Sequence, residues 1–125
     1  KGKHLFPVIE EQYFDRFIEI SPNNISNLEK RLHGKILFTP GHTSDSISLK
    51  IENIIFCGDA AMNGIPSSKR ITIWIEDKNT FYNSWNTLID EKANIIYPAH
   101  GKPFDSNDLK KYINYIPKIV LYKLK

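Results

Sequence analysis

The sequence has little cysteine, no long apolar run and no excess of charge of one sign. Its single cysteine, Cys57, excludes an internal disulfide. No apolar segment approaches the ~20 residues needed to cross a bilayer, and the start, Lys1 to His4, lacks the apolar stretch of a signal peptide. The 17 Lys and Arg residues are scattered among 14 Asp and Glu residues. Nucleic acid and membrane are therefore not expected partners, and a cytoplasmic location is expected.

The chain length predicts one domain. A domain of 125 residues buries roughly two thirds of the surface that its unfolded chain exposes, which is enough for a modest core. We expect this domain to span residues 1–125, with residues 1–14 and 118–125 at its periphery. Because the sequence begins with Lys1 rather than Met, it is expected to be either processed or a piece of a longer chain.

Three short apolar runs each lead into a Gly or Pro turn that carries a side chain able to bind metal. The runs 36–38, 54–56 and 95–97 are rich in Ile, Leu and aromatic residues, as is typical of buried strands. The residues that follow them include His42, Asp59 and His100. If the strands end at one edge of a sheet, these three side chains meet there. Two imidazoles and a carboxylate can bind Zn²⁺ or a similar divalent metal.

The remaining pattern predicts a mixed α and β fold. A short strand is expected over 17–20 and a turn over 21–24, whereas 25–34 is ambiguous, with helical spacing and Gly34 as a terminator. Strict alternation over 46–51 and a tight turn at 52–53 predict a β-hairpin into the strand that starts at Ile54.

Two helices are expected in the C-terminal half of the chain. The segment 60–69 is expected to be a surface loop, and Asp77 should cap a helix. One face of that helix carries Phe81, Trp85, Leu88 and Ile89. A second helix should start after 105–107, bury Leu109, Tyr112, Ile113 and Ile116, and stop or kink at Pro117. Residues 118–125 are compatible with a strand or a helical tail.

The three turn motifs, in order, resemble those of the metallo-β-lactamase fold superfamily of metallo-hydrolases. The matching segments are Thr39-Pro40-Gly41-His42-Thr43, Gly58-Asp59-Ala60-Ala61 and Pro98-Ala99-His100-Gly101. The resemblance implies an α/β fold, the four-layer αββα sandwich, of which this chain would supply one mixed sheet with helices on one face. It also implies a site for two metals, usually zinc, in which His42 binds one metal, His100 binds the other, and Asp59 bridges both.

The family's earlier His-x-His-x-Asp-His motif is missing from this sequence, whose other histidines are His4 and His33. The resemblance therefore covers the C-terminal half of the fold, and the chain is expected to be inactive alone and to hold at most one Zn²⁺. The missing N-terminal half is its expected partner. Without it, an apolar sheet face stays uncovered, which predicts self-association.

With the ligand set complete, a metal-activated water would attack a small-molecule substrate at an ester, thioester, lactone, amide or phosphoester bond, and Asp59 would orient that water. Two alternatives stay open: a non-catalytic binding or assembly module, and an oxidoreductase or dioxygenase that uses iron; manganese is another candidate metal. Thr43, Ser44 and Ser46 either orient His42 or satisfy the turn. Lys69 and Arg70 either meet an anionic substrate or are exposed loop charge, whereas Cys57 is expected to be buried.

Overall fold

The computed structural model describes residues 16–121. The segment 1–15, which contains His4 and the whole expected N-terminal periphery, and residues 122–125 lie outside the described residues. No helix in the described part of the chain has the length and apolar character that a membrane crossing requires.

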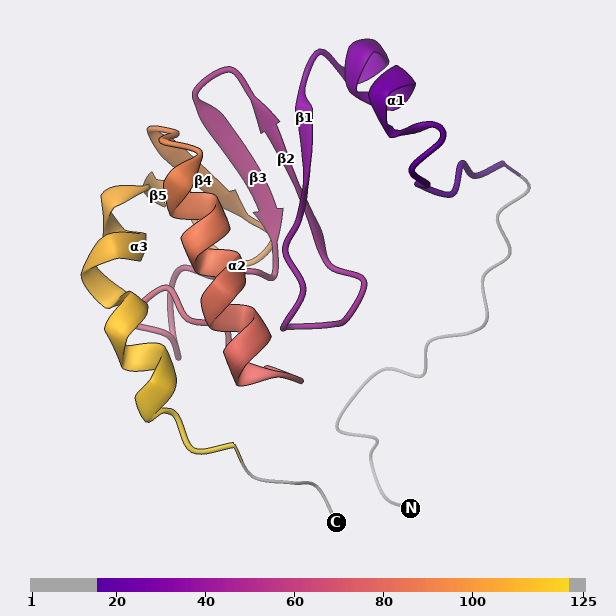
Figure 1. Ribbon diagram of the computed structural model, residues 1–125. Helices are drawn as coiled ribbons and strands as arrows, with labels where there is room; N and C mark the ends of the chain where they lie inside the picture. Colours follow the sequence, from indigo (N-terminus) through magenta and orange to yellow (C-terminus); the bar gives the residue numbers. More distant parts are fainter. Residues whose placement is uncertain (1–15, 122–125) are drawn as a thin grey trace, which may run out of the picture.

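The structure is one mixed sheet with helices packed against it (Figure 1). Its five strands lie in chain order. They are β1 (Lys35–Phe38), β2 (Ile47–Ile51), β3 (Ile54–Gly58), β4 (Ile95–Pro98) and β5 (Phe104–Asp105). Only the β3–β4 pair is parallel. Helix α2 (Lys78–Asp90) lies in the crossover that a parallel pair requires.

One face of the sheet carries the core. Helix α2 and helix α3 (Asn107–Tyr112) lie on the same side of the sheet in Figure 1. Fully or almost fully buried side chains from strands and helices form one apolar cluster there, which includes Leu37, Ile55, Cys57, Ile96, Phe81, Trp85 and Leu88. The expected α/β architecture with helices on one face is confirmed, and so is the buried position of Cys57.

The predicted hairpin and helices are confirmed in their main features. β2 and β3 pair across the turn at Glu52-Asn53. Asp77 caps α2 by accepting a hydrogen bond from the Thr80 N–H at 2.8 Å. The ambiguous segment forms helix α1 (Ile25–Leu32), which ends at His33 in a left-handed conformation, with the Gly34 N–H bonded to the Glu29 carbonyl at 3.1 Å.

The predicted strand over 17–20 was wrong. These residues have no strand assignment, and Phe17 is 78% exposed, because no strand within residues 16–121 pairs with them. The prediction of a surface loop over 60–69 was wrong at its start, because Ala60, Ala61 and Met62 are buried. The Trp85 indole of α2 donates to the Ala60 carbonyl, and the Met62 N–H donates to the Arg70 carbonyl.

The C-terminal segment also differs from prediction. The second helix becomes a 3₁₀ helix, η1 (Ile113–Lys118), which contains Pro117. Residues 119–121 are neither strand nor helix. The Lys78 ammonium donates to the carbonyls of Pro117 and Ile119, both at 3.0 Å, and holds this segment beside the start of α2. The short strand β5 has no sequence signal of its own, because two residues are too few for any periodicity.

Candidate functional site

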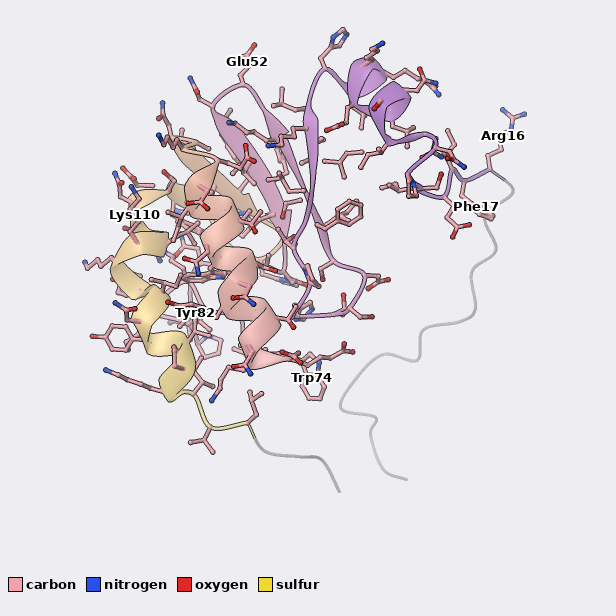
Figure 2. The ribbon with its side chains drawn as sticks, viewed as in Figure 1. Arg16, Phe17, Glu52, Trp74, Tyr82 and Lys110 are labelled. Carbon is pink, nitrogen blue, oxygen red and sulfur yellow. The ribbon has the colours of Figure 1, made fainter. Side chains whose placement is uncertain are left out.

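The topology brings three strand ends to one edge of the sheet. β1 and β3 both run antiparallel to β2, and β4 runs parallel to β3, so β1, β3 and β4 point the same way. Their carboxyl ends lead to His42, Asp59 and His100 respectively. Figure 2 shows this edge at the end of the molecule that carries Trp74, with the hairpin tip at Glu52 at the opposite end.

Helix α2 fixes two of the three turns. Its Ser84 hydroxyl donates to the Pro40 carbonyl at 2.6 Å, two residues before His42. Its Trp85 indole N–H donates to the Ala60 carbonyl at 2.7 Å, one residue after Asp59. Both side chains are buried, so these bonds are shielded from water. The helix therefore sets the distance between the His42 and Asp59 turns.

Glycine permits close contact in the other turn. Gly101 has φ +96°, and a Cβ there would lie 1.6 Å from the Asn63 carbonyl oxygen. The neighbouring Asn63 N–H donates to the His100 carbonyl at 2.9 Å. Only glycine lets the segment after β3 lie this close to the segment after β4.

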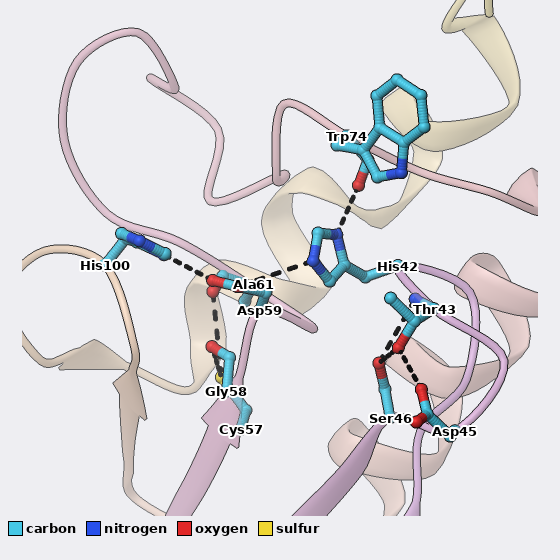
Figure 3. A network of polar contacts seen from close by, with 10 residues as sticks. All are labelled: His42, Thr43, Asp45, Ser46, Cys57, Gly58, Asp59, Ala61, Trp74 and His100. Atoms are coloured by element: carbon cyan, nitrogen blue, oxygen red, sulfur yellow. Dashed lines mark hydrogen bonds and ion pairs between the residues drawn. The ribbon is translucent and has the colours of Figure 1, made fainter. Parts of the chain in front are cut away.

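The Asp59 carboxylate lies between the two imidazoles (Figure 3). Its Oδ1 is 2.5 Å from His100 Nδ1, and its Oδ2 is 3.5 Å from His42 Nε2. The His42 and Asp59 side chains are 21% and 27% exposed, whereas His100 is 69% exposed. The three residues singled out from the sequence are thus brought together, with the carboxylate shared between them.

His42 is held by a partner that the sequence pattern did not indicate. Its Nδ1 lies 2.7 Å from the Trp74 carbonyl oxygen. Because a carbonyl only accepts, Nδ1 carries a proton, and in the neutral ring Nε2 then presents its lone pair toward Asp59. Two acceptors that face each other repel unless a proton or a cation lies between them. No sequence signal reveals this contact, since Trp74 acts through its backbone.

The hydroxyl groups after His42 serve the turn instead. The Thr43 hydroxyl bonds the Asp45 carboxylate and the Ser46 hydroxyl, both at 2.7 Å, and the Ser46 hydroxyl also accepts from the Thr43 N–H. Of the two roles considered, the structure supports the satisfaction of turn groups for Thr43 and Ser46.

The positive charges of the nearby loop are occupied elsewhere. Arg70 donates to the Asp108 carboxylate at 3.0 Å and to the Asn63 side chain. The Lys69 ammonium lies 5.1 Å from the centre of the Tyr115 ring. Neither residue lines the pocket at the three strand ends. Arg70 is therefore not the exposed loop charge that the sequence suggested.

The side chains do not form a closed metal site as they stand. Within residues 16–121, no three or more His, Cys, Asp or Glu side chains are grouped so that they could hold a metal ion. The geometry fits a partial ligand set: a carboxylate oxygen and an imidazole nitrogen face each other across 3.5 Å. A catalytic metal takes about three protein ligands and one open position, and a two-metal site needs more.

Burial separates Cys57 from this chemistry. Burial is the main cause that raises the pKa of the thiol to about 12, and it outweighs weaker hydrogen-bond effects of the backbone at Ala61 and at Cys57 itself, which lower the pKa. A thiol with so high a pKa is neither a ready nucleophile nor a ready ligand at neutral pH.

Comparison with known proteins supports the architecture. No protein-family model matches the chain. A curated relative, beta-lactamase-like protein 2 homolog from Caenorhabditis elegans, is 29% identical over 93 residues, which cover 73% of this chain and 28% of the relative.

Solved structures give the same result. An archaeal metallo-beta-lactamase superfamily protein from Sulfolobus tokodaii has a TM-score of 0.58 and 18% identity, over 74% of this chain and 36% of its own. A metallo-beta-lactamase from Pontibacter korlensis has a TM-score of 0.55 and 17% identity, over 69% and 43%. The chain spans less than half the length of each of these proteins. It therefore carries part of the metallo-β-lactamase fold.

Proposed function

We propose that this chain is the C-terminal portion of a metal-dependent hydrolase and that His42, Asp59 and His100 belong to its metal site. One observation carries the proposal: both imidazoles approach the same carboxylate, one at each oxygen, at the edge where three strands end. Carboxylate bridging with an imidazole on either side suits a pair of divalent ions, for which zinc is our first candidate and iron or manganese the others.

The hydrogen bond to His42 supports this assignment. Ligating histidines usually donate their second ring N–H to a carbonyl or carboxylate, which fixes the tautomer and leaves the other nitrogen for the metal. The Trp74 carbonyl takes that place on His42 Nδ1, at 2.7 Å. His42 Nε2 is then oriented for ligation before any metal binds.

Asp59 has the catalytic role in this proposal. A bound divalent metal lowers the pKa of a water molecule and polarises the substrate oxygen. The Asp59 carboxylate would accept a hydrogen bond from the attacking water and fix its direction toward the substrate. The bond cleaved would be an ester, thioester, lactone, amide or phosphoester.

The remaining ligands must come from outside these residues. Two histidines and one carboxylate are too few for a bridged pair of metals. The chain covers 28% of its curated relative and 36% of the Sulfolobus protein, so a complete protein of that length has room for them. We expect the isolated chain to hold at most one zinc and to show no hydrolysis above background.

Equilibrium dialysis against Zn²⁺ followed by elemental analysis tests the proposal. The parent chain should bind about one zinc. Because each of His42→Ala, Asp59→Asn and His100→Ala removes one ligand, each should weaken zinc binding at least about tenfold. His33→Ala is the matched control, because His33 is exposed at the end of α1 and should bind like the parent. Binding that the three site variants leave unchanged, or no binding by the parent at millimolar zinc, would contradict the proposal.

A further inference from the structure

The pocket at the three strand ends has one polar and one apolar wall. Its volume is about 260 Å³. His42, Asp59 and His100 line one part, and the rest is formed by Met62, Thr72, Ile73 and Trp74. Two of these apolar side chains are largely in water, since Ile73 is 71% and Trp74 is 49% exposed. A group that enters this pocket therefore meets both the candidate ligands and hydrocarbon.

A second pocket continues the apolar wall. It measures about 290 Å³ and shares Thr72, Ile73 and Trp74 with the first. Its other lining residues, Ile75 and the segment 119–121, add only hydrocarbon side chains, and Val120 is 71% exposed. The Lys78 bonds to the Pro117 and Ile119 carbonyls hold that segment in place. Apart from the three candidate ligands, the lining of the two pockets forms one largely apolar surface, which we call the Trp74 groove; it consists of Met62, Thr72, Ile73, Trp74, Ile75 and residues 119–121.

The charges around the Trp74 groove do not favour an anion. Its lining contains no Lys or Arg within residues 16–121. Arg70 is paired with Asp108, and Lys69 lies over Tyr115. The Lys78 ammonium already donates to two carbonyls. An anionic group buried here would lose its hydration without gaining an ion pair, which is costly.

We propose, in an inference that rests on the proposed function, that the substrate carries an uncharged apolar group, alkyl or aromatic, next to the bond that is hydrolysed. This group lies against Met62, Ile73 and Trp74 and extends toward residues 119–121. Burial of apolar surface stabilises the complex by about 25 cal/mol per Å², so the exposed indole of Trp74 supplies a large part of the affinity. The groove thereby selects neutral acyl or aryl substrates over anionic ones of the same length.

NMR on the metal-free chain tests this substrate class with two probes of equal length, octanamide and octanoate. The indole N–H resonance of Trp74 reports on the groove, and that of Trp85, which is fully buried and bonded to Ala60, is the internal reference. Octanamide should shift the Trp74 resonance saturably and leave that of Trp85 unchanged. Octanoate should bind about tenfold more weakly, because its charge finds no partner.

Two variants show where octanamide binds, and its binding is followed through the methyl resonances of Ile73. Trp74→Ala should weaken octanamide binding about tenfold, whereas Phe56→Ala, an aromatic deletion on the far sheet face, should leave it unchanged. Octanoate binding as tight as that of octanamide, or insensitivity to Trp74→Ala, would overturn the proposal. Octanamide binding only after removal of residues 122–125 would also overturn it, by assigning the groove to the end of the chain itself.

The test is independent of the zinc measurement. Because no metal is present, failure of zinc binding with retained octanamide binding contradicts the proposed function alone. Zinc binding with no octanamide binding contradicts the substrate class alone.

Discussion

Single residues at the site edge are constrained by backbone contact as much as by chemistry. Gly101 lies where the segment after β4 passes the Asn63 carbonyl, with no room for a Cβ. Gly64 has a similar φ, +110°, but nothing lies within 4 Å of a Cβ built there. The pair separates backbone strain from steric contact, since an alanine would be strained at either position but would meet neighbouring backbone atoms only at position 101.

Gly101→Ala should therefore destabilise the protein more than Gly64→Ala. Each substitution introduces about 1 kcal/mol of strain at positive φ, and Gly101→Ala should cost about 1–3 kcal/mol more, because the Asn63 segment must shift. Urea unfolding of the two variants measures the difference. Equal midpoints would show that the approach of the two segments is not needed for stability.

Cys57 provides a second test at the residue scale. The residue is 1% exposed, and the pKa of its thiol is raised to about 12, chiefly by burial. An aromatic disulfide reagent at pH 8 should react with the folded protein at the rate of unfolding and with the urea-unfolded chain at the rate of a free thiol. Rapid reaction in the native state would contradict the burial of the strand that leads to Asp59.

At the scale of elements, one carboxylate links the end of α2 to the first two strands. Glu91 accepts from Lys35 at 2.5 Å and from Lys50 at 3.3 Å, and its side chain is 13% exposed. Burial alone would raise the pKa of Glu91, but the hydrogen bonds and charges of the two lysines outweigh burial and lower that pKa below its ordinary value. The ionised form is thus favoured in the folded state.

The pH dependence follows from this shift. A carboxyl whose pKa is lower in the folded state than in the unfolded state stabilises the fold above the unfolded value, about 4.3. That stability is lost as the pH falls through the folded value. Glu91→Gln should lower the free energy of unfolding at pH 7, and the difference from the parent should shrink toward pH 3. A difference that stays constant from pH 7 to pH 3 would show that the ion pairs are not its origin.

How far the sequence predicts these elements depends on how local their signals are. The hairpin at Glu52-Asn53 and the Asp77 cap are encoded within a few residues, and both were predicted correctly. The strand over 17–20 failed because a strand depends on a partner. The Trp74 carbonyl contact with His42 links residues 32 positions apart through a backbone atom, so no side-chain pattern reveals it.

The convergence of the site was predictable because it follows from topology. Three apolar runs that end at glycine or proline turns predicted three strand ends at one edge, and the strand directions agree. The position of Arg70 was not predictable, since its partner Asp108 comes from a helix whose packing the sequence does not specify. The metal-ligand role of His42, Asp59 and His100 itself stays a prediction.

At the scale of the whole molecule, the second face of the sheet is apolar. Successive strands align Ile36, Leu49, Phe56 and Tyr97 in one row on the face opposite Ile55 and Ile96. Phe38 is 59% exposed and Phe56 is 45% exposed on this face. Within residues 16–121, α2 and α3 lie on the other side. A face of this kind is typical of a buried interface.

The isolated chain should therefore self-associate. Sedimentation should show an average mass that rises with concentration, because the sheet faces of two copies bury each other. The double variant Phe38→Thr/Phe56→Thr should shift the average mass toward that of the monomer. Ile65→Thr, which removes a 99% exposed apolar side chain from a loop, is the matched control and should not. A parent chain that stays monomeric at all concentrations would argue against an uncovered sandwich face.

The central claim is that His42, Asp59 and His100 ligate metal together, and X-ray absorption spectroscopy of the zinc-loaded chain tests it most directly. We expect two imidazole nitrogens at about 2.0–2.1 Å from the zinc, with oxygen in the remaining positions. His42→Ala and His100→Ala should each remove one imidazole. A shell made only of oxygen, or one that both variants leave unchanged, would contradict the claim.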